Sequence, residues 1–299
     1  MHPFHNILAG VDLIQGKQIG VATMDAVADH AVRQAIWLAS QSGARLTMLS
    51  VLGAHDRIGE REARLALAQL AEQARAQGID PRIVVTCGDS SAEIIRQVQR
   101  EQYDLVLVGT RERRAWSRLL SGSTSRKLLH RCPCPVWISK PGRQTAPQQI
   151  LVASDLSPLS EAVVQMGLEI GQADVARVHI LDVVEFPLDQ LWSPSPADPV
   201  TERYHVQLRG EALQALQQQV ARNEDGPPEP AVSIHVADSD GLADHAVVKF
   251  TREHDIDLLV LGSVGRHGFS GMMLGNMAER LLPQVRCSLL AVKREPLEH

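Results

Sequence analysis

The sequence predicts an α/β fold in which two copies of one doubly wound, five-stranded parallel sheet follow each other in tandem. The clearest observation is an internal repeat: DLVLVGT at 104–110 is matched by DLLVLGS at 257–263, and ILAGVD at 7–12 by ILVASD at 150–155. A third pair, LLHRCPCPV at 128–136 and LLPQVRCSL at 281–289, closes each copy. A chain of 299 residues is also long enough for two domains of about 150 residues each.

The predicted strands are short apolar runs without alternation, which is typical of parallel strands covered on both faces. Five fall in each half of the chain. They are 6–11, 45–51, 82–87, 104–109 and 134–139 in the first half, and 149–154, 177–184, 231–236, 257–262 and 287–292 in the second.

Helical patterns separate the strands. Apolar residues spaced by three and four positions predict amphipathic helices. This spacing occurs at Val32, Ala35, Ile36 and Ala39, at Leu67, Leu70, Ala71 and Ala74, at Val163, Met166, Gly167 and Ile170, and more weakly over 205–222. Alternating strands and helices with right-handed crossovers give a Rossmann-like, doubly wound sheet, whose ligands bind beyond the carboxyl ends of the strands.

We expect the two domains to cover 1–142 and 147–296, and the terminal 297–299 to be the remnant of an expression tag. The first half is about 11 residues longer after its first strand, roughly over 13–29. The second half is longer after its second strand, in a segment that contains Pro187, Pro194, Pro196 and Pro199. Proline cannot continue a helix or a central strand, so both differences should fall in loops.

Composition argues against several classes of function. A formal net charge of −5 is unlike that of a duplex-DNA binder, and 3% aromatic residues provide few stacking platforms for single strands. No apolar run approaches the roughly 20 residues that span a bilayer, and the N-terminus does not resemble a signal peptide. Four cysteines are too few for a disulfide framework, which favours the cytoplasm. Cys132 and Cys134 read as small apolar residues that enter a strand, not as metal ligands.

A glycine-rich loop follows the fourth strand of the second half. Gly262 and Gly265 come directly after the strand, and Gly275 and Asn276 open the last helix. Glycine lets a ligand approach the backbone, and free amides at a helix start hold phosphate oxygens. Arg266 adds positive charge. The loop is neither a Walker phosphate loop nor the dinucleotide fingerprint that follows a first strand.

The spacing Gly262, Gly265, Gly275, Asn276, together with Asp155 at the end of the first strand, resembles the universal stress protein family. The likeness covers nearly the whole chain twice, and the details are similar to the E-type tandem members of proteobacteria. The resemblance implies a non-enzymatic stress-response protein that binds ATP, ADP or AMP and acts through protein partners. It also implies two halves paired as a pseudo-dimer within the chain, with a possible homodimer of whole chains.

Carried over by motif, the loop amides would hold the phosphates, and Asp155 and Val183 would lie against the adenosine. The departure is Asn276, where the family pattern prefers serine or threonine. The substitution motivates an alternative ligand, such as a nucleotide-sugar or an acyl-bearing metabolite. A further alternative is slow ATP hydrolysis or autophosphorylation, for which no catalytic residue can be named. Asp155 and Asp182 could hold Mg²⁺ beside a phosphate, or could simply cap turns.

The first copy departs further from the pattern. Glu112 stands where the second loop glycine would be, and it adds a negative charge at the place of the phosphate. The extra residues after Asp12 begin beside the same edge. We therefore expect the first copy not to bind ATP in the usual way, although Arg111, Arg113 and Arg114 could attract another anion.

Overall fold

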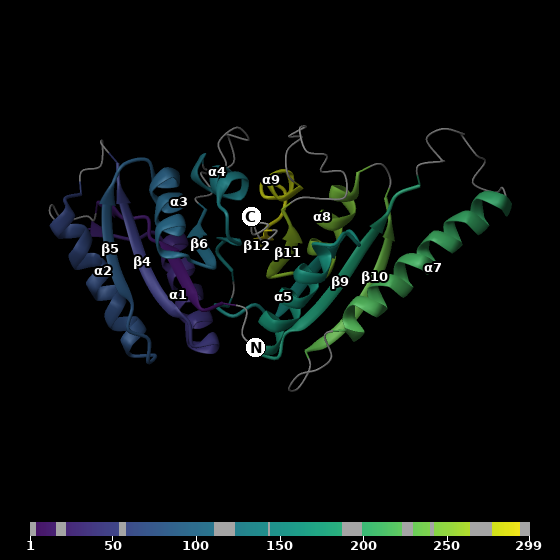
Figure 1. Ribbon diagram of the computed structural model, residues 1–299, viewed down its shortest axis with the longest axis horizontal. Helices are drawn as coiled ribbons and strands as arrows, with labels where there is room; N and C mark the ends of the chain where they lie inside the picture. Colours follow the sequence, from purple (N-terminus) through teal and green to yellow (C-terminus); the bar gives the residue numbers. More distant parts are fainter. Residues whose placement is uncertain are drawn as a thin grey trace. The chain divides into compact units, whose positions relative to one another are not determined.

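A computed structural model of the chain describes residues 4–15, 22–53, 58–110, 123–142, 144–186, 199–222, 230–239, 242–263 and 277–293. The chain divides into two compact units (Figure 1). The first comprises Met1–Ala146 together with Cys287–His299, and the second comprises Pro147–Arg286. In the described part, no helix is both long and apolar enough to cross a bilayer.

The first unit contains a sheet whose strands run β5-β4-β1-β6-β7, all parallel. They are β1 (Asn6–Gly10), β4 (Arg45–Leu52), β5 (Arg82–Cys87), β6 (Leu105–Gly109) and β7 (Val136–Ser139). The connecting helices are α1 (Ala26–Ser42), α2 (Glu60–Arg75), α3 (Ser90–Glu101) and α4 (Ser123–Arg131). The last strand of the chain, β12 (Ser288–Val292), adds to this sheet by pairing antiparallel with β7.

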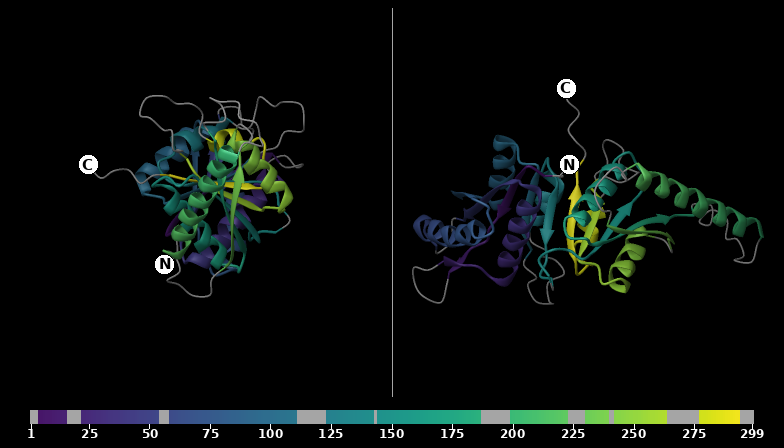
Figure 2. Two further views of the ribbon diagram at one scale, coloured as in Figure 1. Left: turned by 90° about the vertical axis from the view of Figure 1, so that its right-hand side faces the viewer. Right: turned by 90° about the horizontal axis from the view of Figure 1, so that it is seen from below.

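The second unit has the strand order β10-β9-β8-β11, again all parallel. Its strands are β8 (Gln149–Ser154), β9 (Arg177–Val184), β10 (Ala231–Asp238) and β11 (Leu258–Gly262). Its helices are α5 (Ser160–Gln172), α7 (Pro199–Ala221), α8 (Ala243–Glu253) and α9 (Met277–Leu281). Figure 2 shows α7 and α8 on opposite sides of the strands, so both faces of this sheet are covered.

The predicted α/β fold is confirmed, and both ends of each predicted strand lie within two residues of the ends of the observed strand. Burial explains this agreement. In β11, for example, the side chains of Leu258, Leu259 and Val260 are fully buried. A strand that is buried on both faces has apolar residues at consecutive positions, which makes it visible in the sequence.

Two expectations need correction. Helix α1 already begins at Ala26, so the extra segment of the first half is shorter than 13–29. It contains a small antiparallel pair, β2 (Ile14–Gln15) with β3 (Ala22–Thr23), and ends at Asp25, whose carboxylate caps α1 by accepting from the amides of Val27 and Ala28 at 3.1 and 2.9 Å. Helix α7 begins at Pro199 instead of 205, because the first helical position needs no amide hydrogen.

The last strand has a partner that the sequence did not predict. Strand β12 is found where the sequence places the strand at 287–292, and it pairs antiparallel with β7, with Leu289 opposite Ile138 and Leu290 opposite Trp137. The Ser288 hydroxyl accepts a hydrogen bond from the Lys140 amide at 3.1 Å. The apolar run marks a buried strand, but it carries no information on the direction or identity of the neighbouring strand.

Helix α5 packs unusually close to β8. A Cβ atom added to Gly167 would lie 2.2 Å from Val152 Cγ2, which is too close for any real contact. The absence of a side chain at Gly167 therefore permits the helix to approach the centre of the sheet.

We predict that Gly167→Ala destabilises the protein by about 1–3 kcal/mol, because the new methyl group forces helix and strand apart. Gly210→Ala in α7 is the matched control, since nothing lies within 4 Å of an added Cβ atom there. That change should stabilise by about 0.5–1 kcal/mol through helix propensity. Urea unfolding followed by circular dichroism measures both, and equal effects at the two positions would contradict this account.

Candidate functional site

The carboxyl edge of the second sheet brings together three of the residues that the sequence singled out. Strand β8 lies between β9 and β11, with Ser154 opposite Asp182 and Ala153 opposite Leu261. Asp155 follows β8 directly, Val183 is near the end of β9, and Gly262 ends β11. The chain leaves β8 toward β9 and returns to its other side through β11, so strand order reverses here, where doubly wound sheets bind their ligands.

The remaining predicted residues lie outside the described part of the chain. They are Gly265, Arg266, Gly275 and Asn276 of the second copy and Glu112 of the first. Their roles therefore stay predictions from the sequence. The described structure ends on one side of the glycine loop at Ser263, which is buried at the end of β11, and resumes on the other side at α9.

The Asp155 carboxylate shapes the turn that leads from β8 into α5. Its Oδ1 accepts a hydrogen bond from the Ser157 amide at 3.0 Å. The intervening Leu156 has a φ of 57°, a left-handed conformation that is uncommon for a side chain of this kind. Among the described residues, Oδ2 of Asp155 has no hydrogen-bond partner, and the residue is half-buried. One oxygen thus holds the turn while the other is available to a ligand.

Gly262 has a packing role that the sequence did not reveal. A Cβ atom at this position would lie 3.1 Å from Leu159 Cδ2, just before α5. The first unit repeats the arrangement, since a Cβ on Gly109 would lie 3.0 Å from Val27 Cγ1 in α1. The glycine that ends the fourth strand therefore admits the helix that follows the first strand, in both copies.

A partly buried hydrogen-bond network supports the same edge. The Ser154 hydroxyl donates to Gln219 Oε1 at 3.2 Å, and Gln219 Nε2 donates to the Ser160 hydroxyl at 2.7 Å. Ser160 in turn donates to the Ser157 carbonyl at 2.7 Å. Ser154 and Ser160 are 6% and 2% exposed, so the network ties α7 to both ends of the turn at Asp155.

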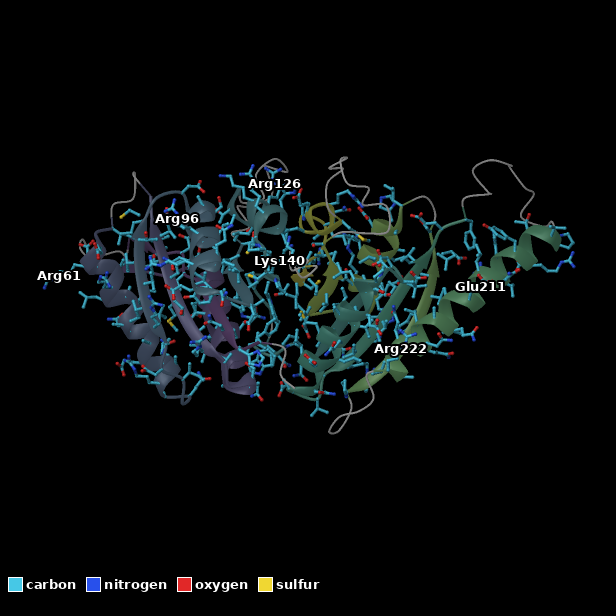
Figure 3. All side chains as sticks on the ribbon, viewed as in Figure 1. Arg61, Arg96, Arg126, Lys140, Glu211 and Arg222 are labelled. Atoms are coloured by element: carbon cyan, nitrogen blue, oxygen red, sulfur yellow. The ribbon has the colours of Figure 1, made fainter. Side chains whose placement is uncertain are left out.

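Sequence analysis missed Gln219, which lies in the run of glutamines at 217–219. Nothing in that local pattern distinguishes this half-buried glutamine from its exposed neighbours. A second, exposed link joins the same two helices near their ends. Arg222, which Figure 3 labels after α7, pairs with Glu161 of α5 at 3.1 Å.

Asp182 differs from Asp155 in its surroundings. It is 4% exposed and lies opposite Ser154 in the register, whereas Val183 projects from the other face of β9. Within the described ranges, no group of three or more histidine, cysteine, aspartate or glutamate residues is arranged to hold a metal ion. A magnesium ion between Asp155 and Asp182 therefore remains a prediction from the sequence, and it would need ligand oxygens from a phosphate.

The helix that follows the glycine loop is anchored by an ion pair. Arg280 of α9 donates from Nε to Asp244 Oδ2 at 2.6 Å and from its NH2 group to Oδ1 at 3.0 Å. The Asp244 side chain is 6% exposed, and its hydrogen bond raises the pKa of Arg280. In the first unit the matching link is Lys127 to Asp89 at 3.1 Å. Hydrogen bonds from Ser91, the Ala92 amide and Lys127 lower the pKa of Asp89 to about 2.

The cysteines behave as the sequence predicts. Cys132 and Cys134 are 3% and 8% exposed, and their sulfur atoms lie 3.6 Å apart as thiols just before β7. They fill apolar space at the entry to a strand.

Comparisons with known proteins match both copies of the repeat to one protein family. The sequence profile described as "Universal stress protein family" matches residues 16–140 and again 147–293. Universal stress protein E of Escherichia coli K12 is 27% identical over 98% of this chain and 95% of its own length. Universal stress protein E of Photorhabdus laumondii is also 27% identical, over 100% of this chain and 98% of its own length.

Solved structures agree in fold. A functionally unknown protein of Pseudomonas aeruginosa PAO1 has a TM-score of 0.71 at 21% identity, with 98% of this chain and 93% of that chain covered. A universal stress protein of Archaeoglobus fulgidus has a TM-score of 0.67 at 18% identity, with 98% and 97% covered. Two profile matches that together span most of the sequence decide the assignment: the chain belongs to the universal stress protein family.

Proposed function

We propose that the protein binds an adenine nucleotide, or a similar anionic ligand, at the carboxyl edge of its second unit and acts through protein partners. The observation that carries the proposal is the convergence of Asp155, Val183 and Gly262 where strand order reverses. The glycine loop at 262–276 follows from that point in the chain.

Each group at the edge has a chemistry that suits one part of a nucleotide. The free oxygen of Asp155 can accept hydrogen bonds from ribose hydroxyls. Val183 is half-buried and offers an apolar side chain to the adenosine. The backbone amides of the glycine loop, with Arg266, would hold the phosphates. The anchored α9 would keep the end of the loop in place, because Arg280 and Asp244 hold that helix against α8.

The first unit is proposed not to bind ATP in the usual way. Its fourth strand ends in Gly109 as the second unit's ends in Gly262, so the helix packing is shared. The difference lies in the loop, where Glu112 brings a negative charge toward the phosphates, and in the segment after Asp12. A carboxylate beside a phosphate costs free energy unless a cation lies between them.

A non-enzymatic role is favoured because, among the described residues at this edge, no general base for phosphoryl transfer can be assigned. Asp155 holds the turn through Oδ1, and Asp182 is buried. We expect ATP to bind without turnover. Calorimetric titration with ATP, ADP and AMP, together with a phosphate-release assay, tests both halves of this statement. Phosphate release at a rate that depends on the second-unit loop would overturn the non-enzymatic role.

The identity of the ligand is tested on protein purified without added nucleotide. Mass spectrometry after denaturation should recover an adenine nucleotide at close to one molecule per chain. Recovery of a nucleotide-sugar or an acyl-bearing metabolite instead would retain the site and replace ATP as its occupant.

Gly265→Glu should weaken ATP binding by more than about tenfold, because it places in the second loop the carboxylate that the first loop already has at Glu112. Arg113→Glu is the control: it adds the same side chain to the loop of the first copy and should leave the measured affinity unchanged. Calorimetry with Mg-ATP gives both values. Unchanged affinity in Gly265→Glu would refute the placement of the site.

Asp155→Asn separates the structural and binding roles of that residue. The amide oxygen can still accept from the Ser157 amide, so the free energy of unfolding should change by less than about 0.5 kcal/mol. ATP affinity should fall about tenfold or more, because the side-chain NH₂ group cannot accept from ribose hydroxyls. Asp12→Asn, at the corresponding position of the first copy, should leave affinity unchanged. A loss of affinity only in the Asp12 variant would move the site to the first unit.

A further inference from the structure

Three histidines of the second unit meet at the edge of the sheet opposite to the candidate ligand site. His179 lies on β9, His235 on β10 and His254 directly after α8. The ring centroids of His179 and His235 are 5.2 Å apart, and those of His179 and His254 are also 5.2 Å apart. Phe250 stacks on His254 at 3.8 Å between centroids. We call these four side chains, with Gln149, the histidine cluster.

The hydrogen bonds of the cluster determine where its protons are. A Gln149 Oε1 atom can only accept, so His179 Nε2, 3.2 Å away, carries a hydrogen. When both rings are neutral, His235 Nε2 donates to His179 Nδ1 at 3.0 Å. The Phe250 carbonyl accepts from His254 Nδ1 at 3.2 Å. One added proton reverses the bond between His179 and His235, whereas protonation of both rings places two N–H groups face to face and breaks it.

The surroundings of His179 also disfavour a positive charge. The residue is 5% exposed. Burial, then the nearby His235, His254 and Arg177, lower its pKa to about 4. Burial and His254 lower the pKa of His235 as well.

The described charged groups on the elements around the cluster are exposed, as are Arg177 and Asp255, or form hydrogen bonds elsewhere. On α8, Lys249 pairs with Glu253 at 3.9 Å, and both side chains are exposed. Asp257, before β11, accepts from the Gln148 and Gln149 amides at 3.0 Å each. Arg252 is an exposed cation on the same helix.

The first unit fills the corresponding positions with groups of a different kind. In the strand register, Thr47 corresponds to His179, and its hydroxyl accepts from the buried Tyr103 hydroxyl at 3.0 Å. Nearby, Arg82 of β5 pairs with Glu101 of α3 at 3.2 Å. Neither a hydroxyl pair nor an Arg–Glu pair contains a group that changes charge near neutral pH, whereas histidine does.

We propose that the histidine cluster is an acid-triggered switch: its protonation releases β10 and α8 from β9 in the second unit, while the corresponding β5 and α3 stay in place on β4 in the first. The first unit has a buried histidine of its own, His30, but it lies in α1. Strand β10 is the edge strand of its sheet, so it can separate without breaking the pairing of β8 with β11. His179 is buried and His235 half-buried, and burial lowers the pKa of both. The stability that neutral His179 contributes is therefore complete above about pH 6.5 and is lost as the pH falls toward about 4. In that window the opening equilibrium shifts by about tenfold per pH unit for each histidine that takes up a proton.

An ion pair at the other end of β10 also contains a titratable group, but this group titrates at a lower pH than the histidines. Asp238 is held by Arg209 of α7 at 2.8 and 2.5 Å, and this contact lowers the pKa of Asp238 below its ordinary value of 3.8. The Asp238 contribution is therefore lost only at a lower pH than that of the histidines.

Amide hydrogen exchange of the full chain tests the proposal, with rates corrected for the intrinsic effect of pH. Between about pH 7 and about pH 5, peptides from β9, β10 and α8 should lose protection by about tenfold or more. The matching peptides from β4, β5 and α3 should retain theirs. Equal loss in the two sets, or no loss in either, would overturn the proposal.

Substitutions in the histidine cluster test whether it causes the loss of amide protection at low pH. His235→Gln keeps an N–H donor for His179 but cannot titrate, and His179→Asn keeps an acceptor. Either change should move the loss of protection to lower pH by about half a unit or more. His245→Gln is the matched control, because His245 is an exposed histidine at the start of α8 outside the cluster. If His179→Asn does not fold, His235→Gln alone decides, and an unshifted transition in that variant refutes the switch.

Discussion

The close approach of α5 to the strands of the second unit is the constraint on which the candidate site depends. A side chain at Gly167 would overlap Val152, and one at Gly262 would press against Leu159. Because glycine has no side chain at these two positions, α5 lies directly on β8 and β11, and the chain must turn sharply at Asp155. Because β8 is flanked on both sides, this turn falls where strand order reverses. The position of the ligand edge is thus a consequence of how tightly a helix can pack on a sheet.

The two repeats share this backbone and differ in what surrounds it. Gly109 and Gly262 both end a fourth strand under the helix that follows the first strand. The copies differ in the segments that connect strands and helices, where the fold tolerates changes. The first copy has the β2–β3 pair and Glu112, and the second has α7 and the long segment that joins β9 to it. Divergence in loops would let one copy keep a ligand site while the other loses it, as we propose, since the strands and helices bear the stability.

The opposite edge of each sheet shows the same divergence in buried polar groups. A buried polar atom must find a partner, but several pairings satisfy that requirement. The first unit uses Thr47 with Tyr103, and the second uses His179 with His235 and Gln149. The two solutions both satisfy their hydrogen bonds near neutral pH. They differ in acid, because only the second contains imidazole groups, which take up protons as the pH falls.

The sequence by itself determined the strands, the tandem repeat and the carboxyl edge as the place to look, because strands buried on both faces leave apolar runs and the repeat confirms each of them. It could not determine that β12 pairs with β7, that Gln219 bridges Ser154 and Ser160, or that His179, His235 and His254 meet. These contacts join residues far apart in the chain, and their local patterns do not differ from those of exposed polar residues. Only the packing of helices on the sheet brings such side chains together, so the tertiary structure alone decided which polar groups contact one another.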